Sequence, residues 1–444
     1  MVKKPANIVY GVDDRPPVLV TIIMGLQHIF VMSSTLVLPV VIIQEIGGTF
    51  LEAKSLVSFS MIAAGIGTIV QGIRKGPLGS GYLVPNLCGP SYLAISMRSA
   101  WLGGLPLMHG MTIIGGFFEA LFSRVVHRLK KLFPTEITGL VVLMVAVTLI
   151  PLGASKFVGI ELPGDDIKPN HLAVAALTIL CMIGFNIWGK GKAKLYCVLI
   201  GMVVGYALSW ATGIFSADDF DRVLQSAVFA LPGKGVKRFA WDFDLSLVIP
   251  IMIVSLCNSL KSIGNIITAQ KINDAEWKEP DMKNIGNGLL ADSVSVMSSG
   301  MLGGVATDTS ASNVGMSFAT GATSRYIAFT AGAMFVLLGF LPKIAAVFSI
   351  MPTPVMGAIL IFVTSFMILA GFQIILSGEH STRKIFIIGI SFIFGLSVDM
   401  LPGLYKSIPS WLTPIFGSSL TLATVLAIIL NQIFSIGSDR ERKA

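Results

Sequence analysis

The sequence has few charged residues. Only 13% of its 444 residues are Asp, Glu, Lys or Arg, and 54% are hydrophobic, whereas soluble globular proteins contain about 25% charged residues. The mean hydropathy is +0.80, so the chain has too little polar side-chain surface to cover a water-soluble fold. We therefore expect a polytopic α-helical membrane protein whose solvent is partly lipid.

Cysteine is also scarce, and the motifs of common enzyme classes are missing. All four cysteines lie in apolar segments, with neither metal-site spacing nor a disulfide framework. The sequence contains no Walker loop, no Gly-x-Ser-x-Gly and no His-Glu-x-x-His motif. This excludes ATP-driven transport by this chain alone, and we predict that the protein is not an enzyme and has no cofactor or metal.

Long apolar runs account for most of the chain. A hydrocarbon core of about 30 Å requires about 20 apolar residues per helix. Counting such runs predicts fourteen transmembrane segments. They lie near residues 17–44, 52–73, 81–98, 105–126, 134–153, 171–188, 195–215, 245–269, 284–303, 305–320, 326–350, 353–376, 384–401 and 413–435.

The basic residues indicate an orientation. If the N-terminus lies inside and the loops alternate sides, about two thirds of the Lys and Arg residues fall on the inside, as the positive-inside rule requires. We therefore expect a multi-pass protein of the inner (plasma) membrane with both termini cytoplasmic and no cleavable signal peptide. The formal net charge of +8 is spread over short loops, so we expect lipid rather than nucleic acid as the partner.

The third and tenth segments are interrupted. The third begins GSGYLVPNLCGPSYLAISM and the tenth begins GGVATDTSASNVGMSFATG, and both contain Gly, Ser or Pro where a helix would begin. Matched interrupted segments in two halves are typical of inverted-repeat transporters. We predict a short extended stretch and then a half-helix in each, with N-termini that favour electron-rich ligand groups. The alternative is two glycine-rich packing helices.

Lys261 is the one basic residue that falls deep inside a predicted segment. Asn258, Lys261 and Asn265 follow the spacing i, i+3, i+7, so they share one helix face. A lysine in mid-membrane must pair with a carboxylate, bind an anion or lose its proton. Two interpretations stay open: a static pair with Asp292 or Asp308 that braces two helices, and a cation that faces a ligand.

Other polar residues in the predicted spans also leave alternatives open. His28, which follows Gln27 in the first segment, is either a core donor or a gating residue. Asp308 is either a functional acid or a helix cap, although Ser310 and Ser312 are better placed for capping. Three acidic residues lie nearer the segment ends and are expected to be interfacial or structural: Glu119, Glu136 and Asp399.

Several stretches resemble one family. The sequence NVGMSFATG from Asn313 to Gly321 is similar to the Asn-x-Gly-x-x-x-x-Thr motif of the nucleobase–ascorbate transporters, the xanthine/uracil permeases. Further similar stretches follow the family's order over residues 11 to about 400. They are Gln27-His28, GSGYLVP…GPSYLA (79–94), LADSVS (290–295) and MPTPVMGA (351–358).

The resemblance implies an architecture. It implies fourteen segments as two inverted repeats of seven, short antiparallel strands in segments 3 and 10, and an elevator-like motion of a core domain against a gate domain, often in a homodimer. The core domain would comprise residues 17–126 and 241–350, and the gate domain would comprise residues 127–240 and 351–435. The cytoplasmic termini would be residues 1–16 and 436–444.

The resemblance also implies a site and a coupling ion. The implied substrate-binding residues are Ser91, Tyr92 (stacking on the base), Lys261, Asn265, Ala311 (through its backbone), Ser312 and Asn313. The implied coupling or gating residues are Gln27, His28, Asp292 and Asp308. The candidate coupling ions are H⁺ and Na⁺.

Two residues depart from the family pattern. Lys261 stands where the family has a glutamate, and Ser312 stands where it has Glu, Gln or Pro. An ammonium can only donate hydrogen bonds, so we expect a site of reversed sign and atypical ion coupling, in which Lys261 replaces the proton or titrates itself. The expected function is secondary transport of a xanthine-, uracil- or urate-like nucleobase. The alternatives are a small-anion carrier or channel and a non-transporting membrane sensor or scaffold.

Overall fold

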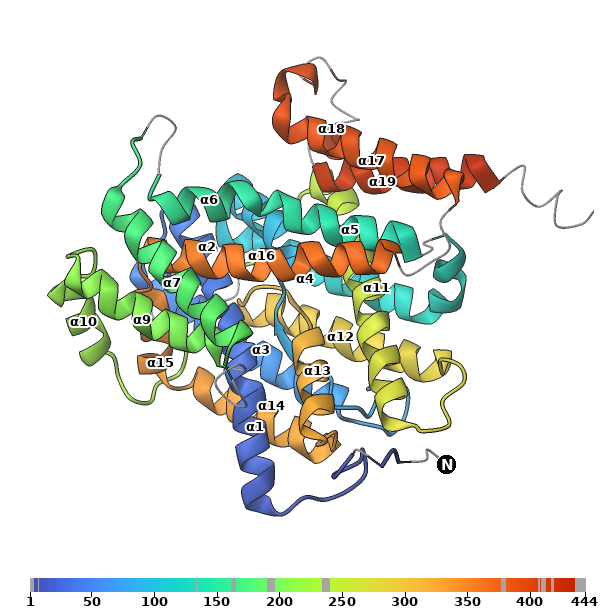
Figure 1. Ribbon diagram of the computed structural model, residues 1–444, viewed down its shortest axis with the longest axis horizontal. Helices are drawn as coiled ribbons and strands as arrows, with labels where there is room; N and C mark the ends of the chain where they lie inside the picture. The colour runs from blue at the N-terminus through green and yellow to red at the C-terminus, as the bar shows by residue number, and fades with distance from the viewer. Residues whose placement is uncertain are drawn as a thin grey trace, which may run out of the picture.

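The computed structural model describes most of the chain. The described residues are 4–6, 8–132, 135–160, 165–189, 196–233, 240–376, 381–405, 408, 413–416 and 419–435. The predicted cytoplasmic C-terminus, 436–444, lies outside them, as do several of the loop lysines on which the predicted orientation depends. Helices make up most of the described chain, as the composition predicts (Figure 1).

The helices follow the apolar runs. In the first half they are α1 (Val18–Ser33), η1 (Ser34–Leu36), α2 (Val37–Glu45), α3 (Phe50–Gln71), η2 (Pro90–Tyr92), α4 (Leu93–Leu132), α5 (Thr135–Thr148), α6 (Ile150–Val158), α7 (Pro169–Ile187), α9 (Cys197–Ala211) and α10 (Ala217–Leu224). In the second half they are η3 (Leu245–Leu247), α11 (Val248–Asn273), α12 (Met282–Leu302), α13 (Ala311–Thr320), α14 (Arg325–Gly339), α15 (Pro342–Ser349), α16 (Thr353–Leu376), α17 (Thr382–Met400), η4 (Pro402–Tyr405), α18 (Thr413–Phe416) and α19 (Ser419–Ser435).

Not every apolar run forms one long straight helix. Among the described residues, seven helices are long and apolar enough to cross a membrane, and an eighth is added if α14 and α15, bent by 80°, are counted as one span. α4 is interrupted at Gly103 and Gly104, and Gly104 has φ +68°, which favours glycine. These helices confirm a polytopic membrane protein, whereas the layout of fourteen spans in two inverted repeats stays a prediction.

The helices pack in two groups. In one group α12 packs against α4 and α3, α14 packs against α3, and α11 packs against α4. In the other group α16 lies alongside α5, α6 and α7, and α17 packs against α19, as the orange and red ribbons of Figure 1 show. The strands and the half-helix α13 belong to the first group, which therefore positions the residues considered below.

Two short strands join the interrupted segments. β1 (Asn86–Cys88) pairs antiparallel with β2 (Thr307–Thr309), in the register Asn86 opposite Thr309 and Cys88 opposite Thr307. Pro85 directly precedes β1, and Pro90 begins η2 two residues after the strand, at the first position of a helix, where proline is tolerated. The backbone N–H of Ser310 donates to the carbonyl of Pro85 at 2.9 Å and extends the pair. This confirms the antiparallel strands predicted for segments 3 and 10.

The N-terminal stretch is fixed to the end of α13. Val9 and Tyr10 both donate their backbone N–H to the carbonyl of Gly321, which ends α13 with φ +64°. Asp13 forms ion pairs with Arg74 (2.9 Å) and Arg325 (2.6 Å). Residues before the first span thus connect α13, α14 and the loop after α3.

Candidate functional site

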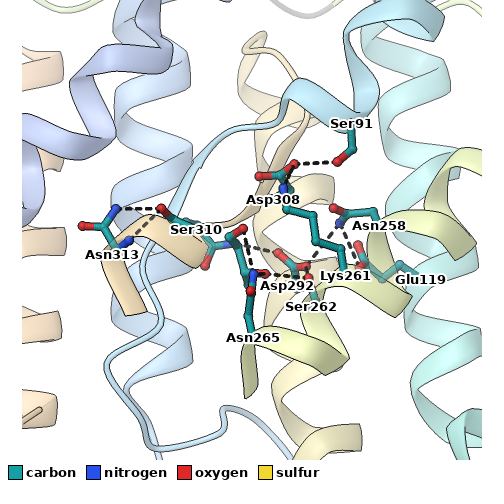
Figure 2. Close-up of polar contacts among 12 residues, drawn as sticks. Ser91, Glu119, Asn258, Lys261, Ser262, Asn265, Asp292, Asp308, Ser310 and Asn313 are labelled. Carbon is teal, nitrogen blue, oxygen red and sulfur yellow. Dashed lines mark hydrogen bonds and ion pairs between the residues drawn. The ribbon is translucent and has the colours of Figure 1, made fainter. Parts of the chain in front are cut away.

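Lys261 is paired with Asp308 beside the strand pair. Its Nζ lies 2.7 Å from Asp308 Oδ2, which also accepts a hydrogen bond from Ser91 Oγ at 2.9 Å (Figure 2). The Asp308 side chain is fully buried, whereas 24% of the Lys261 side chain is exposed. Of the two carboxylates that the sequence offered as partners, the structure selects Asp308. The ammonium group thus lies beside a carboxylate, and the reversed sign of the binding site stays a prediction.

Asp292 lies in a separate polar cluster. Its Oδ1 accepts from Asn86 Nδ2 at 2.6 Å, and its Oδ2 accepts from Ser262 Oγ at 2.5 Å and from Asn258 Nδ2 at 3.3 Å. The carboxyl group is fully buried. Asp292, on α12, therefore connects strand β1 to helix α11 instead of pairing with Lys261.

Asn265 faces the backbone of strand β2. Its Nδ2 donates to the carbonyl oxygen of Thr309 at 3.1 Å and to Thr309 Oγ1 at 2.9 Å. Thr309 Oγ1 also lies 2.8 Å from Ser262 Oγ. The side chain predicted to contact substrate thus fixes the end of β2 in this conformation.

His28 and Asn313 contact each other across α1 and α13. His28 Nδ1 lies 2.7 Å from Asn313 Oδ1, an arrangement in which the ring nitrogen is the donor. Asn313 Nδ2 donates to Ser310 Oγ at 2.9 Å, and the Asn313 backbone N–H donates to the same oxygen at 3.2 Å. All three side chains are buried, and Gln27 Oε1 has no partner among the described residues. His28 therefore positions the family's Asn motif.

Replacing Ser310 with alanine tests this arrangement. The change removes the N-cap of α13 and the acceptor for the Asn313 amide, so we expect the free energy of unfolding to fall by about 1 kcal/mol. The matched control is Ser324→Ala, which removes the N-cap of α14, where Ser324 Oγ accepts from Tyr326 N. Thermal unfolding with and without ligand should show weaker ligand stabilisation only in Ser310→Ala. Equal ligand stabilisation in both variants would reduce Ser310 to a helix cap.

An exposed face adjoins Lys261. Gly264 on α11 and Gly315 on α13 are exposed, and a Cβ atom built on either would meet nothing within 4 Å. Ala311 and Ser312, in the first turn of α13, are exposed as well. We call Lys261, Gly264, Ala311, Ser312 and Gly315 the open face. The two helices that carry these residues, α11 and α13, contact each other.

Tyr92 does not lie on the open face. Its side chain is 1% exposed and packs in an apolar cluster with Ile95, Met111 and Val254. Its hydroxyl has no hydrogen-bond partner among the described atoms. In this conformation the ring has no free side on which a base could stack.

The sequence left Glu119 as either an interfacial or a structural residue, and its burial favours the structural role. It lies in α4 and is fully buried. Its Oε1 accepts from Asn258 Nδ2 at 3.2 Å and from Ser259 Oγ at 3.3 Å (Figure 2). A signal was present in the sequence, because Glu119 stands within the otherwise uncharged stretch from Met111 to Phe122. An acid flanked by apolar residues on both sides is a candidate for burial.

A cavity of about 450 Å³ lies elsewhere, where α2 ends and α3 begins. Thr49, Phe50, His171, Asp219 and Arg222 are among its lining residues, and no predicted site residue lines it. Nearby, Lys156 on α6 forms an ion pair with Glu45 on α2 at 2.6 Å. The cavity is therefore separate from the open face.

Comparison with known proteins gives a consistent result. The model of the Permease family (Xan_ur_permease) matches residues 19–404. The chain is 31% identical to the putative purine permease CPE0397 of Clostridium perfringens, over 99% of this chain and 97% of that protein. It is 26% identical to the xanthine permease XanP of Escherichia coli, over 97% and 95%, and 26% identical to the uric acid permease PucJ of Bacillus subtilis, over 95% and 94%.

A solved structure shares the fold. The transmembrane domain of the cyanobacterial bicarbonate transporter BicA superposes with a TM-score of 0.58 at 14% identity, over 94% of this chain and 97% of that domain. At this identity the likeness concerns the fold alone. The family match indicates a membrane transporter and not an enzyme.

Proposed function

The chain belongs to the Permease family of xanthine/uracil permeases, and from that premise we propose that it is a secondary transporter of a nucleobase. The proposed solute is a base of the xanthine, uracil or urate kind, and the proposed location is the plasma membrane. Support comes from the relatives named for purine, xanthine and uric acid transport, which match nearly the whole chain.

One structural observation supports this solute class above others: the Lys261–Asp308 pair stands at the edge of the open face. Xanthine, uracil and urate present ring carbonyls beside ring N–H groups. Lys261 is the exposed member of the pair and has three N–H donors, of which Asp308 uses one. Lys261 would donate to a ring carbonyl, while Asp308 holds the ammonium group in place and reduces its charge, so that a neutral base is accommodated.

The first turn of α13 supplies further donors. The N-terminal N–H groups of a helix have no partner within the helix, and here the Asn313 N–H is already bonded to Ser310 Oγ. The N–H groups of Ala311 and Ser312 remain at the exposed start of α13. They would bind a second carbonyl or a charged ring oxygen, which the helix dipole also favours.

Transport by an elevator-like movement belongs to the proposal. The group that contains α3, α4, α11, α12 and α14 would move with the strands and α13 against the group that contains α5, α16, α17 and α19.

Lys261 occupies the place of a family glutamate, so ion coupling would be atypical, with H⁺ or Na⁺ as the candidate ion. A homodimer and cytoplasmic termini belong to the same proposal.

A small-anion carrier is the second candidate. The observation that favours it is the exposed fraction of Lys261, 24% of the side chain, next to a helix N-terminus. An anion could compete with Asp308 for the ammonium group, which a neutral base does not do. This candidate requires Lys261 to leave Asp308 when the ligand binds.

A binding screen distinguishes the two. We expect xanthine, uracil or urate to raise the melting temperature of the purified protein, since a ligand that binds only the folded state stabilises it by about 2.7 kcal/mol at 100 times its dissociation constant. Lys261→Ala should lose this stabilisation, and Lys278→Ala, an exposed lysine between α11 and α12, should keep it. Stabilisation by small dicarboxylates but by none of the bases would contradict the nucleobase proposal and favour the anion carrier.

A further inference from the structure

Two buried carboxyl groups from different helices meet at one amide. Glu119 on α4 and Asp292 on α12 are both fully buried. Asn258 Nδ2, on α11, donates to Glu119 Oε1 at 3.2 Å and to Asp292 Oδ2 at 3.3 Å (Figure 2). The two acids therefore lie within hydrogen-bond reach of the same nitrogen atom, at the junction of α4, α11 and α12.

Among the described residues, no cation neutralises both acids. Tyr92 and Asp308 lie close enough to interact with the acids, and the ammonium group of Lys261 is already paired with Asp308 at 2.7 Å. Two carboxylates that share a buried site repel each other, and burial disfavours the charged form of each. One of the two acids must therefore retain a proton.

The hydrogen bonds show which acid retains it. Asp292 accepts three hydrogen bonds, from Asn86, Ser262 and Asn258, and both of its oxygens are used. Glu119 accepts only through Oε1, whereas its Oε2 is buried without a partner among the described atoms. A carboxylate is stabilised by the donors that it accepts, so Asp292 is the better anion and the proton belongs on Glu119 Oε2.

Further unsatisfied atoms surround the pair. Asn258 Oδ1 and Asn86 Oδ1 are buried acceptors without a donor among the described atoms, and both belong to amides whose Nδ2 already donates to the acids. Buried polar atoms without partners cost free energy and are rare in folded proteins. These two side chains adjoin the acid pair from α11 and β1, so the described part of the cluster holds more acceptors than donors.

We propose that Glu119 and Asp292 form a proton-binding site that holds one exchangeable proton between α4, α11 and α12. The inference rests on the proposed transport function for its physiological role, but not for the existence of the proton. Within that function the site would hold the coupling proton, and it lies away from Lys261.

Hydrogen bonds connect this proton site to strand β2 and to Asn265. Asn265 Nδ2 donates to Thr309 Oγ1, Thr309 Oγ1 lies 2.8 Å from Ser262 Oγ, and Ser262 Oγ donates to Asp292 Oδ2. Asn86 connects Asp292 to β1 in the same way. If the proton passes from Glu119 to Asp292, Asp292 loses acceptor capacity toward Ser262 and Asn86. Both strands beside the Lys261–Asp308 pair would then be affected.

Infrared spectroscopy of the ligand-free protein tests the site directly. The parent should show the C=O stretch of a protonated buried carboxyl at neutral pH, and Glu119→Gln should lack it. Glu279→Gln, which removes an exposed carboxyl group from the loop between α11 and α12, should keep the band. Absence of the band in the parent, or its persistence in Glu119→Gln, would overturn the proposal.

Stability gives a second, independent result. Glutamine has the shape of a neutral glutamic acid, so Glu119→Gln should unfold within a few degrees of the parent. A large loss of stability in this variant would show that Glu119 is ionised in the folded protein and would contradict the assignment.

Transport then tests the role of the proton. In proteoliposomes an inward proton gradient should stimulate nucleobase uptake by the parent and by Glu279→Gln, and this stimulation should be lost in Glu119→Gln. Stimulation that survives in Glu119→Gln would refute coupling at this site. If the parent takes up no nucleobase but retains the infrared band, the proposed function fails while the proton site stands.

Discussion

Replacing Lys261 with methionine should destabilise the protein by about 3–5 kcal/mol, the range measured when one member of a buried ion pair is removed. The reason is the burial of Asp308, whose side chain is fully buried and whose Oδ1 has no partner among the described atoms. Without the ammonium group at 2.7 Å, only Ser91 Oγ, among the described side chains, would donate to this carboxylate. Chemical or thermal unfolding of the purified protein measures the change.

A double variant is the control for this prediction. Lys261→Met combined with Asp308→Asn removes both charges, and replacing a buried pair as a whole is often close to neutral for stability. We therefore expect the double variant to be markedly more stable than Lys261→Met, with a positive coupling energy between the two positions. If the stability losses of Lys261→Met and Asp308→Asn simply add in the double variant, Asp308 does not hold the Lys261 ammonium in place. The proposed positioning role of Asp308 would then be wrong.

Replacing Gly67 with alanine should also have a large effect. Gly67 lies where α3 packs against α12, and an added Cβ would overlap Ser295 Oγ and Cβ and lie 3.1 Å from Asn86 Cγ. Ser295 Oγ is 2.7 Å from Thr307 Oγ1 in β2, and Asn86 belongs to β1. Overpacking a buried contact typically costs about 1–3 kcal/mol. We expect a loss of this size, together with lost ligand stabilisation, because both strands must move.

Gly315→Ala is the matched substitution for Gly67→Ala. Gly315 also lies in a helix, but an added Cβ there meets nothing within 4 Å, and alanine is the better helix former. We expect Gly315→Ala to unfold at or above the parent's melting temperature. A Gly67→Ala protein that is as stable as Gly315→Ala would show that α3 and α12 separate without cost.

Composition and periodicity were sufficient for the class of fold. An apolar chain with few charges can only be solvated by lipid, and within lipid its backbone polar groups must be satisfied within helices. The prolines and small polar residues around Asn86 and Thr307 predicted extended backbone, and the structure confirms the strands. Hydropathy and the prolines were sufficient for these two predictions because each depends only on residues that are adjacent in the sequence.

Partner choice within the site could not be predicted in this way. The i, i+3, i+7 spacing correctly placed Asn258, Lys261 and Asn265 on one helix face, but their partners differ. Asn258 donates to Asp292 and Glu119. Lys261 pairs with Asp308, and Asn265 donates to Thr309. Periodicity defines a face and not the element that covers it. Asn265 and Tyr92, both predicted to contact substrate, are engaged with protein in this conformation.

The sequence alone thus determined that the protein is a polytopic membrane transporter of this family, because hydropathy, charge placement and ordered motifs are properties of the linear chain. Only the tertiary structure decided that Lys261 pairs with Asp308, that His28 supports Asn313, and that Glu119 meets Asp292. The physical reason is that a buried charge or amide is satisfied by whichever polar atom the packing of helices brings within about 3 Å. For His28 and Asn313 that atom lies 285 positions away along the chain.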